Sequence, residues 1–293
     1  MHNKNLMRKI TTYILALVSV VTIFTSCKKE YETVEELDDK NIQTYKAANS
    51  SLSFTDTAGY SYAITEEGSG AHVLNSDSVY YSYAFKSITG AVYNQTSDLM
   101  IPGTFLGYTD QFAIGSTAYL FKPVREVLAK LKRGGRATLL LPSRMAFGKN
   151  GLSNFGIGSN ETIVVELGLY TYEKRHEVDG FEISTFIARN NLTLATDPSG
   201  VKFNINAEGT GTDVITEKST VVVNYTVRSL DGLVLEAATG YTTRLDMPGL
   251  YKGWTIMIPK LTSGGKMRMV LPTHLGQGRP LDFDIEVTSV TND

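Results

Sequence analysis

The sequence predicts an α+β protein built from two copies of one domain, each an antiparallel twisted sheet wrapped on one short helix. Residues 249–287 carry the signals for one copy in order. A short helix is indicated by apolar residues spaced i, i+3, i+4 and i+7, which share one helical face: Trp254, Met257, Ile258 and Leu261. Two glycines at 264–265 end that helix, and the strand 266–271 that follows stops at Pro272. A closing strand is indicated by strict apolar–polar alternation at Leu281, Phe283, Ile285 and Val287.

The same order of signals occurs earlier, in residues 119–169. The helical spacing recurs ahead of two glycines at 134–135, and a strand at 137–141 ends at Pro142. The residues with that spacing are Val124, Val127, Leu128 and Leu131. Upstream, Ala-Ala-Asn at 47–49 and Glu-Gly-Ser-Gly at 67–70 return as Ala-Arg-Asn at 188–190 and Glu-Gly-Thr-Gly at 208–211. A repeat of this length indicates a duplicated domain, because solenoid units are shorter.

The repeat and the composition divide the chain into four parts. We expect a signal peptide at 1–27, a polar tether or helix at 28–54, a first domain at 55–173 and a second domain at 174–293. The tether is polar and acidic, with apolar residues spaced loosely as in a surface helix, and is interpreted as a solvated linker. A short helix near 181–187 is expected to introduce the second copy.

The first 27 residues resemble a bacterial lipoprotein signal. Lys4, Arg8 and Lys9 precede an apolar run at 10–24 that is short for a membrane-spanning helix. This run leads to Cys27, which is the only cysteine in the chain and therefore the predicted site of lipidation. The alternatives are a membrane-anchor helix or a plain signal peptide. The predicted location is the bacterial cell envelope, with attachment through lipid, most simply to the outer membrane.

Composition argues against several other functions. The net charge of −2 gives no basic face for a nucleic-acid partner. The four histidines are scattered along the chain, so no metal site or cofactor is predicted. Asp282 and Asp284 alternate with apolar residues and are interpreted as solvated carboxylates on the outer face of the last strand.

Two local features refine the second copy. The run 221–225 is the clearest central strand, and Asp231-Gly232 is a hairpin turn. Pro259 lies inside the expected helix, where it removes a backbone donor, so that helix should be kinked or short.

Taken together, these residues resemble FKBP-type peptidyl-prolyl cis–trans isomerases. The second copy has the family order in its Gly-Thr-Gly at 209–211, Val-Asn-Tyr at 223–225, Gly-Trp at 253–254 and closing strand at 281–287. The first copy has the loop at 142–148 and the strand entry at 159–162. The resemblance covers nearly everything from Thr55 to the C-terminus. It implies an apolar aromatic pocket with a Trp floor, aromatic walls, a Tyr donor in a long loop and an Asp near the rim.

Each copy matches this pocket only in part. The second copy retains Trp254, Tyr225 and Phe283, while Leu235 replaces a wall aromatic, Glu236 replaces the Asp and Gln277 stands at the donor Tyr. In the first copy the residues at pocket positions are Tyr83 and Tyr93 as walls, Asn94 for the Asp, Val124 for the Trp, Phe147 for the donor Tyr, Ile157 in the loop and Val165 for the Phe. The loop from Pro272 to Leu281 spans 9 positions, against 21 from Pro142 to Ile163. The first copy also has an insertion at 95–118 whose aromatic residues could form a substrate-binding flap.

Three functions remain open from the sequence. The resemblance implies a lipid-anchored prolyl isomerase acting on proline-containing exported polypeptides. The substitutions at pocket positions also fit a degenerate module that binds proline-containing or unfolded chains without turnover. A third possibility is a surface scaffold whose pockets are filled by their own side chains.

Overall fold

A computed structural model of the chain describes residues 32–114 and 117–292. The predicted signal peptide and the lipidation site Cys27 lie outside these residues. Residues 38–293 form one compact unit, and the β-sheets of the described residues lie within it. Among the described residues, no helix is long and apolar enough to cross a bilayer.

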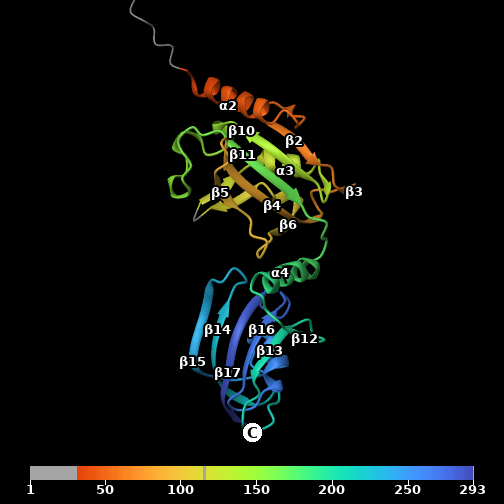
Figure 1. The fold of residues 1–293 in the computed structure, drawn as a ribbon, viewed down its shortest axis with the longest axis vertical. Coiled ribbons are helices and arrows are strands. Elements are labelled where there is room, and N and C mark those ends of the chain that lie inside the picture. The colour runs from red at the N-terminus through yellow and green to blue at the C-terminus, as the bar shows by residue number, and fades with distance from the viewer. Residues whose placement is uncertain (1–31, 115–116, 293) are drawn as a thin grey trace, which may run out of the picture. The chain divides into compact units, whose positions relative to one another are not determined.

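The first sheet has the strand order β1-β2-β10-β11-β4-β5, and neighbouring strands are antiparallel (Figure 1). These strands are β1 (Thr55–Asp56), β2 (Ser61–Glu66), β4 (Ser78–Ser87), β5 (Val92–Gln95), β10 (Arg136–Leu141) and β11 (Ile163–Leu169). The smaller strands are β3 (Ser69–His72), β6 (Gly103–Phe105), β7 (Gln111–Ile114), β8 (Thr117–Leu120) and β9 (Lys132–Arg133). With its helix α3 (Lys122–Leu128), this sheet forms what we call the first domain.

The second sheet repeats this order as β12-β13-β16-β17-β14-β15 (Figure 1). Its strands are β12 (Ala195–Thr196), β13 (Lys202–Ala207), β14 (Thr220–Arg228), β15 (Val234–Arg244), β16 (Lys266–Leu271) and β17 (Leu281–Thr291). With its helix α5 (Lys252–Met257), it forms the second domain. The predicted α+β class, with antiparallel sheets and one short helix packed on each, is confirmed.

The helix of the second domain is shortened at Pro259, as predicted. The α-helix ends at Met257 and continues as a 3₁₀ turn at Ile258–Lys260. Pro259 has no N–H for the i→i−4 ladder, so the last turn tightens. Gly253 allows α5 to pack against β16, since a Cβ there would lie 2.3 Å from Cδ2 of Leu271.

Two further helices differ from the predictions. The first lies where a solvated tether was predicted, and the second is longer than the short helix predicted near 181–187. They are α2 (Val34–Ala48) and α4 (Arg175–Arg189), each 15 residues long. From Asp38 onward, α2 buries Ile42 in a cluster with Leu140 and Val164 of the first sheet. Likewise α4 buries Ile183 and Phe186 in a cluster with Leu230 and Val270. Each helix therefore covers part of the outer face of a sheet.

This cover explains why the prediction of a solvated Asp282 is wrong. Its side chain is 2 % exposed and forms a bidentate pair with Arg268, with both N···O distances at 2.9 Å. The Arg268 guanidinium lies 5.8 Å from the ring centroid of Phe186 on α4. Asp284 is half exposed, as predicted, and pairs with Arg228 at 2.7 Å.

The insertion at 95–118 is partly surface and partly core. Phe105 and Tyr108 are exposed, whereas Phe112 is buried with the core of the first domain. Near the start of the insertion, the Ile101 N–H donates to buried Glu182 of α4 at 2.6 Å. The insertion thus supplies an aromatic residue to the core and a backbone donor to α4.

Candidate functional site

Four aromatic rings surround Trp254 in the second domain. Tyr225 lies 4.9 Å from it between ring centroids, and Phe283 and Tyr251 lie at 6.0 Å. Tyr241 is 6.4 Å away, and Tyr251 also contacts Phe283 edge-on at 4.9 Å. The structure thus brings Trp254, Tyr225 and Phe283 into one aromatic cluster, in which Phe283 is fully buried.

Strand alternation explains how these side chains converge. Tyr225 on β14 pairs with Ile285 on β17, and Val227 pairs with Phe283, so Tyr225 and Phe283 share the core face. Trp254 enters from the first turn of α5, which packs across that face. The period of two in the strands and the start of one helix therefore place the aromatic cluster.

A cleft opens beside this cluster. It has a volume of about 260 Å³ and is lined by residues of β14, β15, the 247–251 segment, α5 and the 273–280 loop: Tyr225, Glu236, Tyr241, Met247, Pro248, Gly249, Leu250, Tyr251, Trp254 and Gln277. A second hollow of about 150 Å³ shares Glu236, Tyr251 and Gln277 and reaches Leu235 and Arg279. Glu236 therefore lines both hollows, and Leu235 lines the smaller one.

The indole N–H of Trp254 is a buried donor without an acceptor among the described residues. Trp254 is 1 % exposed, so water does not solvate this group well. A buried donor left unpaired costs roughly 1–3 kcal/mol. Trp254 lines the cleft, so this buried, unpaired donor belongs to a residue of the candidate site.

Tyr225 and Glu236 form the polar edge of the cleft. The Tyr225 hydroxyl donates to Oε1 of Glu236 at 2.5 Å. Burial raises the pKa of Tyr225 well above its usual range, and the hydrogen bond to the Glu236 carboxylate raises it further. The phenol therefore stays protonated at neutral pH and presents a polarised hydroxyl beside Trp254.

This pair makes the second domain sensitive to alkaline pH. Because the folded pKa of Tyr225 exceeds the unfolded value near 10, the resulting stability is fully present below about pH 10 and is lost as pH rises through the folded pKa. The ¹³Cζ chemical shift of Tyr225, assigned by comparison with Tyr225→Phe, reports whether its phenol is protonated. We expect it to keep its protonated value at pH values where exposed tyrosines ionise. Glu236→Gln should lower its pKa, and Glu217→Gln, at an exposed site, should not. Titration of Tyr225 together with the exposed tyrosines would contradict this account.

The loop at the rim replaces the expected Tyr donor by an amide. Gln277 has φ 57 and its Nε2 donates to the Gly249 carbonyl at 2.8 Å. This bond joins the 273–280 loop to the segment before α5. The rim therefore offers a side-chain amide where the resemblance implies a phenol.

The corresponding region of the first domain is filled by its own side chains. Phe112 from the insertion lies 5.0 Å from Tyr83 and 5.4 Å from both Phe85 and Phe121. Phe147, at the expected donor position, packs against Phe121 and is 9 % exposed. These rings occupy the space that a ligand would need.

The remaining predicted residues of the first domain are distributed as follows. Val124 and Val165 are fully buried in the core, and Ile157 is almost fully buried with them. Tyr93 donates to Glu161, and burial together with this bond raises its pKa to about 12. Asn94 pairs with Phe85 across the β4–β5 ladder and is half buried. Tyr83 and Tyr93 are likewise half buried at the edge of the core cluster rather than beside an open cleft.

Sequence reasoning missed Tyr251, Phe121 and Tyr241, and it assigned Phe112 to a possible flap, whereas Phe112 is buried in the core. Tyr251 and Phe121 occupy the N-cap positions of α5 and α3, three residues before Trp254 and Val124. Their matched spacing in the two copies was a usable signal. Tyr241 lies on a strand whose bulges disturb simple alternation, and Phe112 comes from a segment present in one copy only. Neither position could be read from the repeat.

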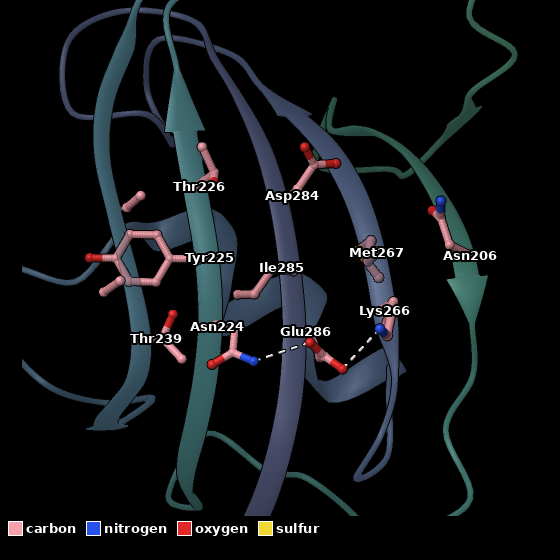
Figure 2. A pocket seen from close by; sticks show the side chains of 12 residues that line it. Asn206, Asn224, Tyr225, Thr226, Thr239, Lys266, Met267, Asp284, Ile285 and Glu286 are labelled. Carbon is pink, nitrogen blue, oxygen red and sulfur yellow. Dashed lines mark hydrogen bonds and ion pairs between the residues drawn. The ribbon is translucent and has the colours of Figure 1, made fainter.

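A larger hollow, of about 490 Å³, lies on the outer face of the second sheet. Figure 2 shows Asn224, Glu286 and Lys266 side by side across three strands. Asn224 Nδ2 donates to Glu286 at 3.1 Å, and Lys266 pairs with Glu286 at 3.0 Å. These groups are satisfied by one another, so the aromatic cleft is the stronger candidate despite its smaller volume. Within the described residues, no group of three or more metal-binding side chains comes together.

The chain is similar in sequence to FKBP-type peptidyl-prolyl cis–trans isomerases. The chain is 31 % identical over 110 residues to a probable FKBP-type peptidyl-prolyl cis–trans isomerase of Haemophilus influenzae, covering 33 % of this chain and 45 % of the relative. It is 31 % identical over 115 residues to the probable isomerase FkpA of Neisseria meningitidis, covering 39 % and 38 %. A macrophage infectivity potentiator of Trypanosoma cruzi is 29 % identical over 106 residues, covering 32 % and 54 %. The chain thus spans about half the length, or less, of these relatives.

Solved structures show a looser likeness. The three FKBP domains of wheat FKBP73 match 82 % of this chain and all of theirs, with a TM-score of 0.33 and 15 % identity. FkpA from Escherichia coli matches 58 % of this chain and 72 % of its own, with a TM-score of 0.34 and 19 % identity. No protein-family model matches the chain.

Proposed function

We propose that the second domain binds proline-containing polypeptide segments in the cleft beside Trp254 and accelerates cis–trans isomerisation of their X–Pro bonds. The observation that carries this proposal is the convergence of Trp254, Tyr225 and Tyr251 on one open cleft, with Phe283 packed against Trp254 and Tyr251 in the core. The sequence likeness to FKBP-type isomerases supports the same activity.

The geometry suits a reaction that needs neither a nucleophile nor a metal. Rotation about an X–Pro bond has a barrier of about 20 kcal/mol, because the planar amide is stabilised by resonance. The twisted amide is less polar than the planar one, so an aromatic cleft that removes water favours it. One N–H of the Gln277 amide is bonded to Gly249, so its second N–H would donate to a flanking carbonyl and orient it.

The proposed clients are exported proteins. This part rests on the sequence, in which a lipoprotein-like signal precedes Cys27. Lipid attachment at Cys27 would hold both domains at the cell envelope, most simply at the outer membrane, where newly exported chains fold.

A second function is favoured by two specific observations. Gln277 stands at the position of the expected Tyr donor, and Phe112 and Phe147 fill the first domain. A domain with these changes could bind proline-containing or unfolded chains without turning them over. In that case the protein is a holding module rather than an isomerase.

Catalysis distinguishes the two functions. The full chain, purified in mild detergent, should accelerate cis-to-trans conversion of an Ala-Leu-Pro-Phe peptide at micromolar concentration. Binding of the peptide without acceleration would favour the holding module. If the peptide is neither bound nor isomerised faster, both functions are rejected and the surface scaffold remains.

A further inference from the structure

A buried aspartate occupies the same place in α2 and α4. Asp38 and Asp179 are 1 % and 3 % exposed, and each accepts hydrogen bonds from the residue that follows Pro142 or Pro272. The two helices match around these residues, since Glu36 and Ile42 of α2 correspond to Glu177 and Ile183 of α4. The duplicated unit therefore begins with the helix, further upstream than the glycine-rich pattern indicates.

Asp179 fixes the start of the rim loop in the second domain. Its Oδ2 accepts the Thr273 N–H at 2.9 Å, and its Oδ1 accepts the Thr273 hydroxyl at 2.6 Å. Arg175 donates from Nε to the same carboxylate at 2.7 Å and to the Thr273 hydroxyl at 3.1 Å. The buried charge is thus paired with a cation, and the loop residue is bonded through both its backbone and its side chain.

Asp38 has the equivalent role in the first domain, where it forms hydrogen bonds at both ends of the longer 143–162 loop. Its two carboxylate oxygens accept the Ser143 N–H at 2.9 Å, and Oδ2 accepts the Ser143 hydroxyl at 2.8 Å. Its Oδ1 also accepts the Thr162 hydroxyl at 2.6 Å. One carboxylate thus closes a loop whose ends are 19 positions apart in sequence.

The loop held by Asp179 is the one that borders the candidate site. Thr273 begins a turn in which the Leu275 and Gly276 N–H groups donate to the Pro272 carbonyl. Four residues after Thr273, Gln277 lines the cleft and is bonded to Gly249. The position of the Gln277 amide therefore depends on where this short loop starts.

We propose that Asp179 is a positioning residue for the cleft: through Thr273 it fixes the 273–280 loop and the Gln277 amide at the rim. Asp38 does the same for the 143–162 loop of the first domain. This inference rests on the proposed function only in its claim that the loop serves ligand binding. The anchoring of the loop is a separate claim that can be measured without a ligand.

Substitutions at Thr273 test the anchor without removing the buried charge. Thr273→Val keeps the side-chain shape but removes the hydroxyl donor, whereas Thr273→Ser keeps the donor that Ser143 supplies in the first domain. In the full chain we expect amides 274–279 to exchange hydrogen about tenfold faster in Thr273→Val, corresponding to one lost hydrogen bond to a charged group. Thr273→Ser should exchange like the wild type. Thr288→Val, which removes a hydroxyl bonded to the Val222 carbonyl away from the cleft, is the matched control.

Ligand binding is measured on the same variants by the fluorescence of Trp254, the only tryptophan. We expect Thr273→Val and Asp179→Asn to weaken binding of the Ala-Leu-Pro-Phe peptide several-fold, and to raise KM more than they lower kcat. Unchanged exchange in the loop would overturn the anchor. Faster exchange with unchanged binding would overturn the positioning role while leaving the proposed function intact. A wild-type chain that does not bind the peptide would reject the proposed function and the positioning role, while exchange would still decide the anchor.

Discussion

Replacing Trp254 with alanine is expected to destabilise the second domain by about 3–5 kcal/mol and to abolish peptide turnover. The substitution removes the ring that contacts Tyr225, Tyr251 and Phe283 and leaves a cavity beneath the cleft. Trp254→Phe retains an aromatic ring and should preserve the fold, with kcat/KM lowered by about tenfold, which corresponds to 1.4 kcal/mol of lost transition-state stabilisation. Thermal unfolding and the peptide assay measure the two effects separately.

The matched control for this substitution is in the other copy. Val124 occupies the same position on α3 and is fully buried in the first domain. Val124→Ala should destabilise the first domain by roughly 2 kcal/mol, because it also opens a cavity, while leaving turnover unchanged. If Val124→Ala lost turnover while Trp254→Phe kept it, the site would lie in the first domain, and its assignment to the second would be wrong.

Replacing Phe112 with alanine should destabilise the first domain by about 3–5 kcal/mol and open an apolar cavity beside Tyr83. Phe112 contacts Tyr83, Phe85 and Phe121 edge-on or nearly so, which adds to the free energy gained by burying the ring. The new cavity should increase binding of a small apolar ligand to the first domain, detected by perturbation of the tyrosine resonances. Thermal unfolding reports the change in stability.

Phe105→Ala provides the comparison within the same insertion. Phe105 is 52 % exposed, so its loss should change the free energy of unfolding by less than about 0.5 kcal/mol. If Phe112→Ala were equally harmless and opened no cavity, Phe112 would not be what fills the first domain.

Much of the fold could be predicted because its signals are local and occur twice. Alternation at Leu281, Phe283, Ile285 and Val287 gives the buried face of β17, and the proline at 259 shortens α5 as expected. Tyr225 and Phe283 could be placed together because β-strand periodicity fixes which face a residue occupies. The matched glycines at 134 and 264 also have positive φ in both copies.

The rest depended on contacts that cross the sequence. The spacing of α2 gave no sign that Asp38 is buried, since its partners at Ser143 and Thr162 lie more than 100 positions away. The apolar–polar alternation of β17 predicted that Asp282 faces solvent. In the structure Arg268 pairs with Asp282 and packs against Phe186 of α4, which covers that part of the sheet. The sequence left the filling of the first domain as one of three possibilities, because Phe112 comes from an insertion that the second copy lacks and has no counterpart to compare.

The central claim is that ligands bind beside Trp254, and its indole N–H tests this most directly. Trp254 is the only tryptophan, so the chain has one indole ¹H–¹⁵N resonance. Titration with an Ala-Leu-Pro-Phe peptide should shift this resonance and saturate, and the same peptide with Ala in place of Pro should have little effect. Catalysis of the peptide with an indole resonance that does not move at saturating peptide would contradict the claim.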